Sequence, residues 1–138
     1  MSEKIIRSIY EARLKAWAAA RSPALRVAYE NKKLSPNSGE TYLECYLLPA
    51  RTQSLDMEGI HKAFTGYFQI NIVVPSDTSL VPAGGIAEEL QALFPNNLGL
   101  TKSGLTVYVR TPCAVANAQQ DVATSTTPVS FYYRADVI

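Results

Sequence analysis

The sequence predicts an α+β fold, with one mixed, mainly antiparallel β-sheet and two helices packed on a single face of that sheet. The first observation is the segment AFTGYFQINIVV at residues 63–74, where apolar and polar side chains alternate as in a long strand with one buried face. The second is a pair of helical patterns, one at the start of the chain and one between the third and fourth predicted strands. The third is the element order α-β-β-β-α-β-β, which shows no internal repeat.

Length and composition place the chain among folded globular proteins. Its 138 residues are expected to form one domain, residues 1–138, around one core. The hydrophobic share of 47% and the charged share of 18% argue against global disorder. A formal net charge of +1 gives no basis for holding nucleic acid by bulk charge. No apolar run reaches the roughly 18 residues of a membrane span, and no secretion signal is evident, so no membrane partner is expected.

The N-terminal region predicts a helix followed by a short strand. Ser2 is a suitable N-cap for a helix over residues 2–21, which Pro23 ends. A strand is expected over residues 25–29. Residues 31–40 are rich in Lys, Pro, Asn, Ser and Gly, which is typical of a loop.

The middle of the chain predicts two strands joined by a long loop. Residues 42–48 alternate in polarity and stop at a proline. Residues 51–59 are polar and form the connection, which is longer than a hairpin turn requires. The long strand over residues 63–74 follows and ends at Pro75.

The last part of the chain predicts a helix and two strands. After a loop over residues 76–82, Gly84-Gly85 is expected to open a helix over residues 85–94, which Pro95 ends. Beyond the helix, strands are expected at residues 105–110, with a continuation past Pro112 left open, and at residues 129–135, with a polar loop at residues 119–127 between them.

Sorting the strands by parity assigns one face of the sheet to the core and the other to the outside. The apolar set, expected to face the helices, is Leu43, Cys45, Leu47, Phe64, Phe68, Ile70, Ile72, Leu105, Val107, Val109, Val129, Phe131 and Tyr133. The opposite set is Tyr42, Glu44, Tyr46, Tyr67, Gln69, Asn71, Thr106, Tyr108, Arg110, Ser130, Tyr132 and Arg134. Tyrosine and arginine are enriched at protein interfaces, so the second set is a candidate subunit interface or the lining of a channel. The alternative is an ordinary solvated sheet face, since tyrosine also favours strands.

The first helix carries two apolar stripes, more than a surface helix usually needs. One stripe is Ile5, Ile9, Ala12, Ala16 and Ala20, and the second is Ile6, Tyr10, Leu14 and Trp17, with Arg13 between them. One stripe packs on the sheet in this interpretation, and Tyr10, Arg13, Leu14 and Trp17 are candidates for contact with another subunit. The alternative is a helix sunk in its own core, with Arg13 extended over Trp17.

The loop over residues 51–59 is a candidate contact arm because it combines length with mixed charge. Its charged side chains are Arg51, Asp56 and Glu58, and a mobile solvated loop is the alternative. Cys45 and Cys113 stand alone in predicted strands and are expected to be reduced and buried.

Catalytic and cofactor motifs are mostly absent from the sequence. His61 is the one histidine, so a histidine-based metal site or a Ser-His-Asp arrangement lacks partners. There is no G-x-S-x-G elbow and no phosphate-binding loop. We therefore expect no catalytic residue, no cofactor, no metal and no enzymatic activity.

The order of several short motifs resembles a known family. These are EARLKAWAAARSPALRVAYEN, TYLECYLLPA, GYFQINIVVP, IAEELQALFP and the closing FYYRAD. Together they resemble the small tail-terminator-like proteins of tailed phages and prophages, which are similar to the tail terminator (minor tail) protein of lambda-like phages. The resemblance covers nearly the whole chain.

The resemblance implies a non-enzymatic virion protein with a tail-terminator-like fold. Such a protein forms a homo-oligomeric ring, expected to be a hexamer, that caps the tail tube and ends its polymerisation. Its other partners would be the tail tube protein and the head connector protein, and DNA would pass through the ring without sequence-specific binding. The implied location is the virion tail, and the host cytoplasm during assembly.

Three alternatives stay open at this point. One is a head–tail connector or neck protein of similar size. Another is a soluble, non-enzymatic binding module that uses the tyrosine-rich sheet face for a small ligand or a peptide strand. The third is a small hydrolase, which would need an acid–base pair that the sequence does not display.

Overall fold

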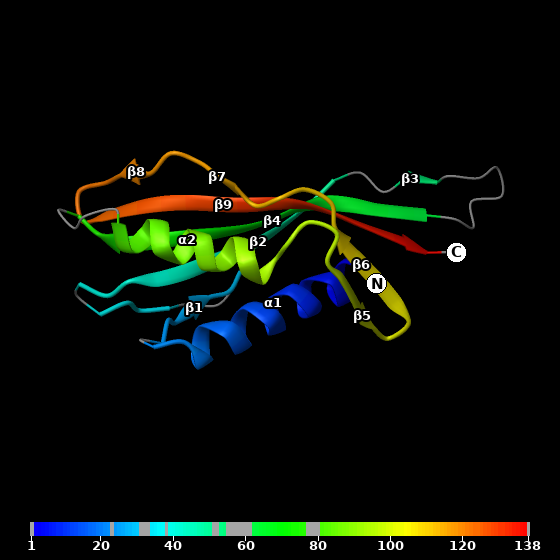
Figure 1. Ribbon diagram of the computed structural model, residues 1–138, viewed down its shortest axis with the longest axis horizontal. Helices are drawn as coiled ribbons and strands as arrows, with labels where there is room; N and C mark the ends of the chain where they lie inside the picture. Colours follow the sequence, from blue (N-terminus) through cyan, green and yellow to red (C-terminus); the bar gives the residue numbers. More distant parts are fainter. Residues whose placement is uncertain are drawn as a thin grey trace.

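Two helices lie along one side of a long twisted sheet (Figure 1). The computed structural model describes residues 2–22, 24–30, 34–37, 39–50, 53–54, 62–76 and 81–137. Helix α1 is Ser2–Ala20 and helix α2 is Val81–Leu93. Their inward side chains share one core cluster with the sheet, so the predicted α+β fold is confirmed.

The described residues form one nine-stranded sheet. Its strands are β1 Val27–Ala28, β2 Tyr42–Pro49, β3 Gln53–Ser54, β4 Lys62–Pro75, β5 Gly99–Lys102, β6 Leu105–Val109, β7 Ala114–Val115, β8 Gln119–Gln120 and β9 Thr124–Val137. The main path runs β1-β2-β4-β9-β6-β5, and β3, β7 and β8 pair at its margins. Only β1 and β2 pair in parallel, so the sheet is mixed and mainly antiparallel, as the sequence predicts.

The antiparallel pair β4 and β9 forms the centre of the sheet. The two strands pair along 14 residues each, from Lys62 opposite Val137 to Pro75 opposite Thr124. The predicted loop over residues 119–127 is therefore confirmed only at residues 121–123, since residues 119–120 form β8 and residues 124–127 begin β9. The Ser- and Thr-rich residues 124–127 become strand because β4 presents a partner edge along its full length, and tertiary pairing outweighs local propensity.

A broken strand accompanies the other edge of β9. Strand β6 pairs with it first, and β7 continues the pairing past Pro112, as the sequence predicts. Strand β8, which falls in the predicted loop, extends the pairing farther along. Strand β5 is not predicted from the sequence. It forms a hairpin with β6 through Ser103 and Gly104, whose φ values of 53° and 79° fit the two left-handed positions of a type I′ turn.

The core lies between the helices and one face of the sheet. Of the apolar set predicted to face inward, every member is buried except Phe64, which is partly buried and packs against the cluster. Cys45 and Cys113 are buried and form no disulfide, as predicted. Burial raises the pKa of Cys45 to about 12 and that of Cys113 to about 11, so both thiols stay protonated at neutral pH.

Helix α1 packs on the sheet through its second apolar stripe, which contains residues that the sequence predicts to contact another subunit. Ile6, Tyr10 and Leu14 are fully buried in the chain's own core. The prediction that Tyr10 and Leu14 contact another subunit is therefore wrong. The larger side chains fill the core because they bury more apolar area than the alanines of the other stripe, whose Ala12, Ala16 and Ala20 are exposed.

The flanking side chains of α1 hold it against α2. The Nε of Arg13 donates a 2.9 Å hydrogen bond to the carbonyl of Leu93, at the C-terminal end of α2, where a cation is favoured. Trp17 is partly buried against the core, and the guanidinium over its ring, 5.5 Å from the centroid, belongs to Arg21 rather than to Arg13. The predicted position of Arg13 over Trp17 is therefore wrong.

Helix α2 begins four residues earlier than predicted. It starts at Val81, with Pro82 in its first turn, where proline needs no backbone partner. Gly84 and Gly85 consequently lie inside the helix instead of opening it.

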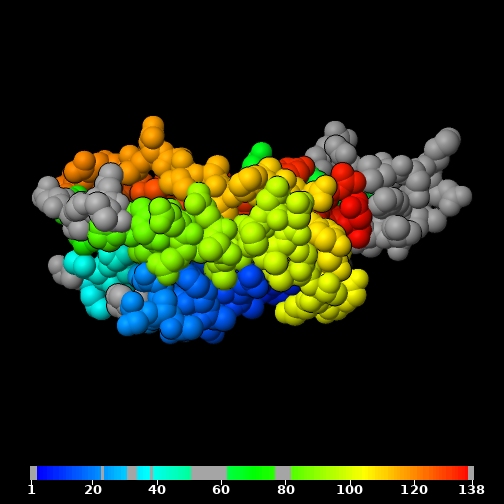
Figure 2. Space-filling view, viewed as in Figure 1, coloured from blue at the N-terminus to red at the C-terminus, as the bar shows by residue number. Residues whose placement is uncertain are grey.

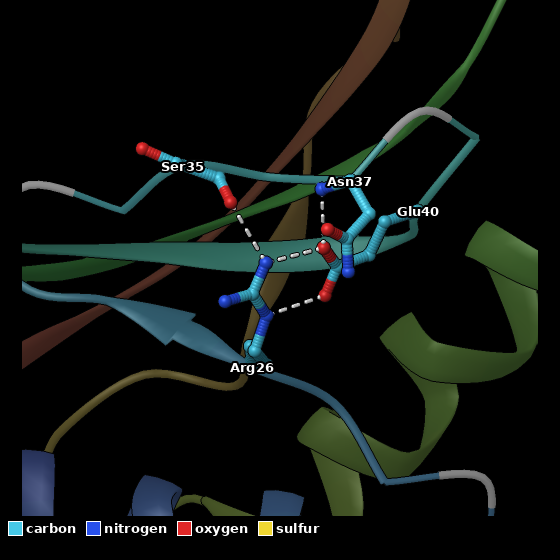
Figure 3. Close-up of polar contacts among 4 residues, drawn as sticks. All are labelled: Arg26, Ser35, Asn37 and Glu40. Carbon is cyan, nitrogen blue, oxygen red and sulfur yellow. Dashed lines mark hydrogen bonds and ion pairs between the residues drawn. The ribbon is translucent and has the colours of Figure 1, made fainter.

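An ion pair fixes the segment that leads into β2 (Figure 3). Arg26 donates to both carboxylate oxygens of Glu40 at 2.6 and 2.7 Å and to the carbonyl of Ser35 at 3.0 Å. The backbone N–H of Asn37 donates to the same carboxylate at 2.8 Å. These hydrogen bonds from Arg26 and Asn37 lower the pKa of Glu40 to about 2.

Candidate functional site: the outer sheet face

The helices cover one face of the sheet, and the described part of the chain places no helix on the other, here called the outer face. Figure 2 shows α1, α2 and the β5–β6 hairpin as a continuous layer of atoms on the helix side. Among the side chains of the outer face are Tyr42, Glu44, Tyr46, Leu48, Thr65, Tyr67, Gln69, Asn71, Thr106, Tyr108, Arg110, Ser130, Tyr132, Arg134 and Asp136. All of these side chains are half-buried or exposed, whereas their neighbours in the strands are mostly buried. Ala63 and Val73 share their parity but are buried.

Strand register brings aromatic side chains of the outer face together. Leu48 on β2 lies opposite Tyr67 on β4, and Tyr67 lies opposite Tyr132 on β9. The rings of Tyr67 and Tyr132 meet edge to face, with centroids 5.3 Å apart and an interplanar angle of 68°. Edge-to-face pairs are a favourable arrangement for aromatic rings, so register and packing together create this cluster.

Three large side chains of this face are unusually open. The exposed fractions are 46% for Leu48, 49% for Tyr67 and 44% for Tyr108. Single exposed apolar residues are common on protein surfaces. Leu48 and Tyr67, however, lie opposite each other, and Tyr132 continues the same row, so they form a patch of the kind that marks contact sites.

An arginine-lined hollow lies at the β6 side of the outer face. It has a volume of about 230 Å³ and is lined by Tyr108, Arg110, Arg134 and Asp136. Arg134 donates to its strand neighbour Asp136 over 3.0 to 3.3 Å, and this partner raises the pKa of Arg134. Arg110 is exposed and has no ion-pair partner among the described residues. One positive charge in the hollow therefore remains unpaired.

The β2 side of the outer face is polar and carries an acid. Glu44 lies between Tyr42 and Tyr46 along the strand, and partial burial together with the Glu44 carboxylate raises the pKa of both tyrosines. On the adjacent strand, the side-chain amide of Gln69 donates a 2.8 Å hydrogen bond to Asn71. The outer face therefore has an acidic, amide-rich side and an arginine-rich side.

A larger hollow of the described structure lies elsewhere, between α1 and the chain after β1. It has a volume of about 350 Å³, and its lining includes Arg7, Glu11 and Glu30. Arg7 pairs with Glu30 at 2.7 Å and with Glu11 at 3.7 Å. Glu30 also accepts a 2.7 Å hydrogen bond from the backbone N–H of Leu47, at the free edge of β2. The charged side chains that line this hollow therefore pair with one another and with the backbone of β2, and they hold α1 and the chain after β1 in place.

Most candidates from the sequence lie on the outer face, and some do not. Tyr42, Tyr46, Tyr67, Gln69, Asn71, Tyr108, Arg110, Tyr132 and Arg134 share that face. Tyr10, Arg13, Leu14 and Trp17 lie in or beside the helix layer and contribute to the core or to helix contacts. Arg51, Asp56 and Glu58 lie outside the described residues, as does His61.

Sequence reasoning missed Leu48 and Asp136. Each continues the period-two parity of its strand, two residues beyond Tyr46 and Arg134 respectively. Leu48 is missed because an apolar side chain is not expected on a polar face. Asp136 is missed because the last strand is predicted to end at residue 135, whereas β9 extends to Val137. Extending each parity to the end of its strand would have found both residues.

The described residues contain no cluster of three or more His, Cys, Asp or Glu side chains that could hold a metal ion. None of the helices in the described part of the chain is both long and apolar enough to cross a membrane.

The fold and the outer face define a small α+β protein that covers one side of its sheet with its own helices and carries an open aromatic cluster on the other. The family model described as phage tail terminator protein matches residues 5–133, so the chain belongs to the phage tail terminator protein family. The predicted resemblance is confirmed, and the family gives the chain a structural role in the phage tail.

A solved structure supports the fold assignment. Its chain shares 42% sequence identity with this protein, with a TM-score of 0.84, and the match covers 98% of this chain and 96% of the other. Comparison with curated proteins finds no match.

Proposed function

We propose that this protein caps the phage tail tube, ends its polymerisation and offers the surface to which the head connector joins. The observation that carries the proposal is the outer face, where Leu48, Tyr67 and Tyr132 form an open cluster in a member of the tail terminator family. Tyrosine-rich patches with arginine at their margin are typical of surfaces that bind other proteins.

The proposed cap is a homo-oligomeric ring, expected to be a hexamer. A closed ring needs two unlike patches on each subunit, so that one patch meets the other on the next copy. The outer face supports this arrangement because its β2 side is acidic and its β6 side is basic. The ring leaves a central passage for DNA, which needs no base-specific contact, and its assembly begins in the host cytoplasm.

The proposed role requires no catalysis and no cofactor. The subunit has only to recognise its own copies, the last ring of the tail tube protein and the head connector protein. All three partners are proteins, and the tyrosine and arginine side chains of the outer face are of the kind that is enriched at protein interfaces.

Tube polymerisation in vitro tests the capping proposal. Purified tail tube protein of the same phage is allowed to polymerise with and without this protein, and tube lengths are measured by electron microscopy. We expect added protein to arrest growth and to form a ring at one tube end. Unchanged tube lengths at saturating protein, with binding to the head connector alone, would assign it to the neck instead.

A further inference from the structure

Two charged side chains of the outer face lack an ion-pair partner among the described residues. Glu44 lies on β2, and Arg110 follows directly after the end of β6. The other two charged side chains of the face, Arg134 and Asp136, pair with each other at 3.0 Å. The face therefore holds one free acid and one free base, on opposite sides of the sheet.

These two charges cannot meet within one subunit. Strand order places two strands, β4 and β9, between β2 and β6, which separates the charges by roughly 14 Å across the sheet. Along the strands, Glu44 lies level with Asn71, whereas the Arg110 N–H bonds to the carbonyl of Tyr132, which lies level with Tyr67. That offset adds about 13 Å, far beyond the reach of a salt bridge.

The hollow around Arg110 has the chemistry of a carboxylate site. A guanidinium offers several N–H donors in a fork that matches the two oxygens of a carboxylate. The neighbouring Tyr108 supplies a hydroxyl, and Asp136 is occupied by Arg134. An incoming carboxylate would pair with Arg110 without competing for the existing Arg134–Asp136 pair.

We infer that the hollow of one copy receives the Glu44 carboxylate of the next copy, so that the β6 side of each outer face meets the β2 side of its neighbour. The inference rests on the proposed ring, and it names the two unlike patches that such a ring requires. Charge complementarity within a single chain selects a second copy as the occupant, since each copy supplies both partners.

Nucleic acid is the less suitable occupant of this face. A surface that holds DNA neutralises several phosphates with unpaired cations. Here a single arginine of the outer face is unpaired among the described residues, and its neighbour in the hollow, Arg134, is already paired with Asp136. The balance of charge favours a protein neighbour.

A charge-swap experiment tests the pairing. The variants are R110E, E44R and the double variant R110E/E44R, with K15E on α1 and E88R on α2 as reversals at exposed sites off the outer face. Assembly is followed over a concentration series by light scattering during size-exclusion chromatography. Capping is followed by tube length in the polymerisation assay, and folding of every variant is checked by thermal unfolding.

The pairing predicts a specific pattern of loss and rescue. Each single reversal should raise the concentration needed for half-maximal assembly or capping roughly tenfold or more, because like charges then face each other. The double variant should return close to wild type, and K15E and E88R should match wild type throughout.

Other patterns overturn the inference in distinguishable ways. Single reversals that assemble and cap like wild type would show that the two charges do not meet, while leaving the proposed function intact. A defect in R110E that E44R does not repair, with weaker binding to a double-stranded DNA oligonucleotide, would assign the hollow to phosphate. If wild type neither assembles nor caps, the pairing and the proposed function fail together.

Discussion

Gly66 occupies a position in β4 where the packing leaves no room for a side chain. A Cβ at this position would collide with the carbonyl oxygen of Leu48 and would lie 2.7 Å from the hydroxyl of Tyr133. Tyr133 lies opposite Gly66 on β9, and its fully buried ring occupies the space that a side chain would need. The glycine is therefore required by close approach of its neighbours.

Replacement of Gly66 by alanine is expected to destabilise the subunit. We predict that Gly66→Ala lowers the free energy of unfolding by about 1–3 kcal/mol, because the neighbouring backbone must shift to admit the methyl group. The matched control is Gly85→Ala, which adds a methyl in open space on α2 and should raise the free energy of unfolding by about 1 kcal/mol. Urea unfolding measures both. Equal effects at the two sites would contradict this account of the packing.

Glu40 should give the subunit a measurable pH dependence. Its pKa falls from an ordinary value of 4.5 to about 2 in the folded protein, first because of its hydrogen bonds with Arg26. A lowered carboxylate pKa stabilises the fold above pH 4.5, and this stabilisation is lost as the pH falls from 4.5 toward 2. We expect Glu40→Gln to be less stable than wild type at pH 7 and to match it near pH 2. Urea unfolding across this range would refute the assignment if the difference stayed constant.

At the scale of single residues, sequence parity predicts most of the outer face but not the environment of each side chain. Tyr67 and Tyr132 follow from alternation alone. Tyr10 does not, because a helical stripe shows which residues share a face without showing which of two stripes meets the sheet. Burial of the larger stripe decides the choice, and that depends on the shape of the core.

Arginine side chains of α1 and of the residue that follows it link α1 to α2. Arg13 reaches the last carbonyl of α2, and Arg21 pairs with Glu89 at 2.8 Å while lying over the ring of Trp17. These contacts cross from one helix to the other. They explain why α1 can lie flat on the sheet with an exposed alanine stripe on its far side.

Loss of the Arg13 contact is expected to weaken the helix layer without changing assembly. We predict that Arg13→Met lowers the free energy of unfolding by about 1–2 kcal/mol, because the carbonyl of Leu93 loses a charged donor. Lys15→Met is the control, since Lys15 is exposed on the same helix and should change stability by less than about 0.5 kcal/mol. A change in the assembled mass of Arg13→Met would contradict this account and would support the predicted contact of Arg13 with another subunit.

At the scale of elements, long periodic segments can be predicted and short or paired ones cannot. The strand over residues 63–74 is found almost at its observed bounds because its alternation is long. Strand β5 is missed because four residues carry little periodicity, although the Ser103-Gly104 turn is a usable hairpin signal. The first residues of β9 are missed because their conformation depends on β4.

The whole molecule is organised by the contrast between a covered and a free sheet face. One face is closed by two helices, and the other carries the Tyr67–Tyr132 pair at its centre and opposite charges toward its sides. In this phage tail terminator protein, one face is buried in the subunit's own core, and the other is the surface that we propose for contact with neighbours. Parity in the sequence already separates the two faces, whereas the pairing of side chains across the outer face follows from strand register.

Removal of the central tyrosine should separate assembly from folding. We predict that Tyr67→Ser abolishes the ring at concentrations where wild type forms it, while the free energy of unfolding of the subunit changes by about 1 kcal/mol or less. Val122→Ser, at an exposed turn off the outer face, should leave assembly unchanged. Light scattering and urea unfolding give the two readouts. Normal assembly of Tyr67→Ser would exclude its side chain from the interface.

The most direct measurement is a cryo-electron microscopy reconstruction of the head-proximal end of the assembled tail. We predict a closed ring of this chain on the last layer of tube protein, with the Tyr67–Tyr132 cluster buried between neighbouring copies. A tail end that lacks this chain would contradict the capping role. A ring in which the outer face is open to solvent or lines the DNA passage would contradict the central claim that this face joins the subunits.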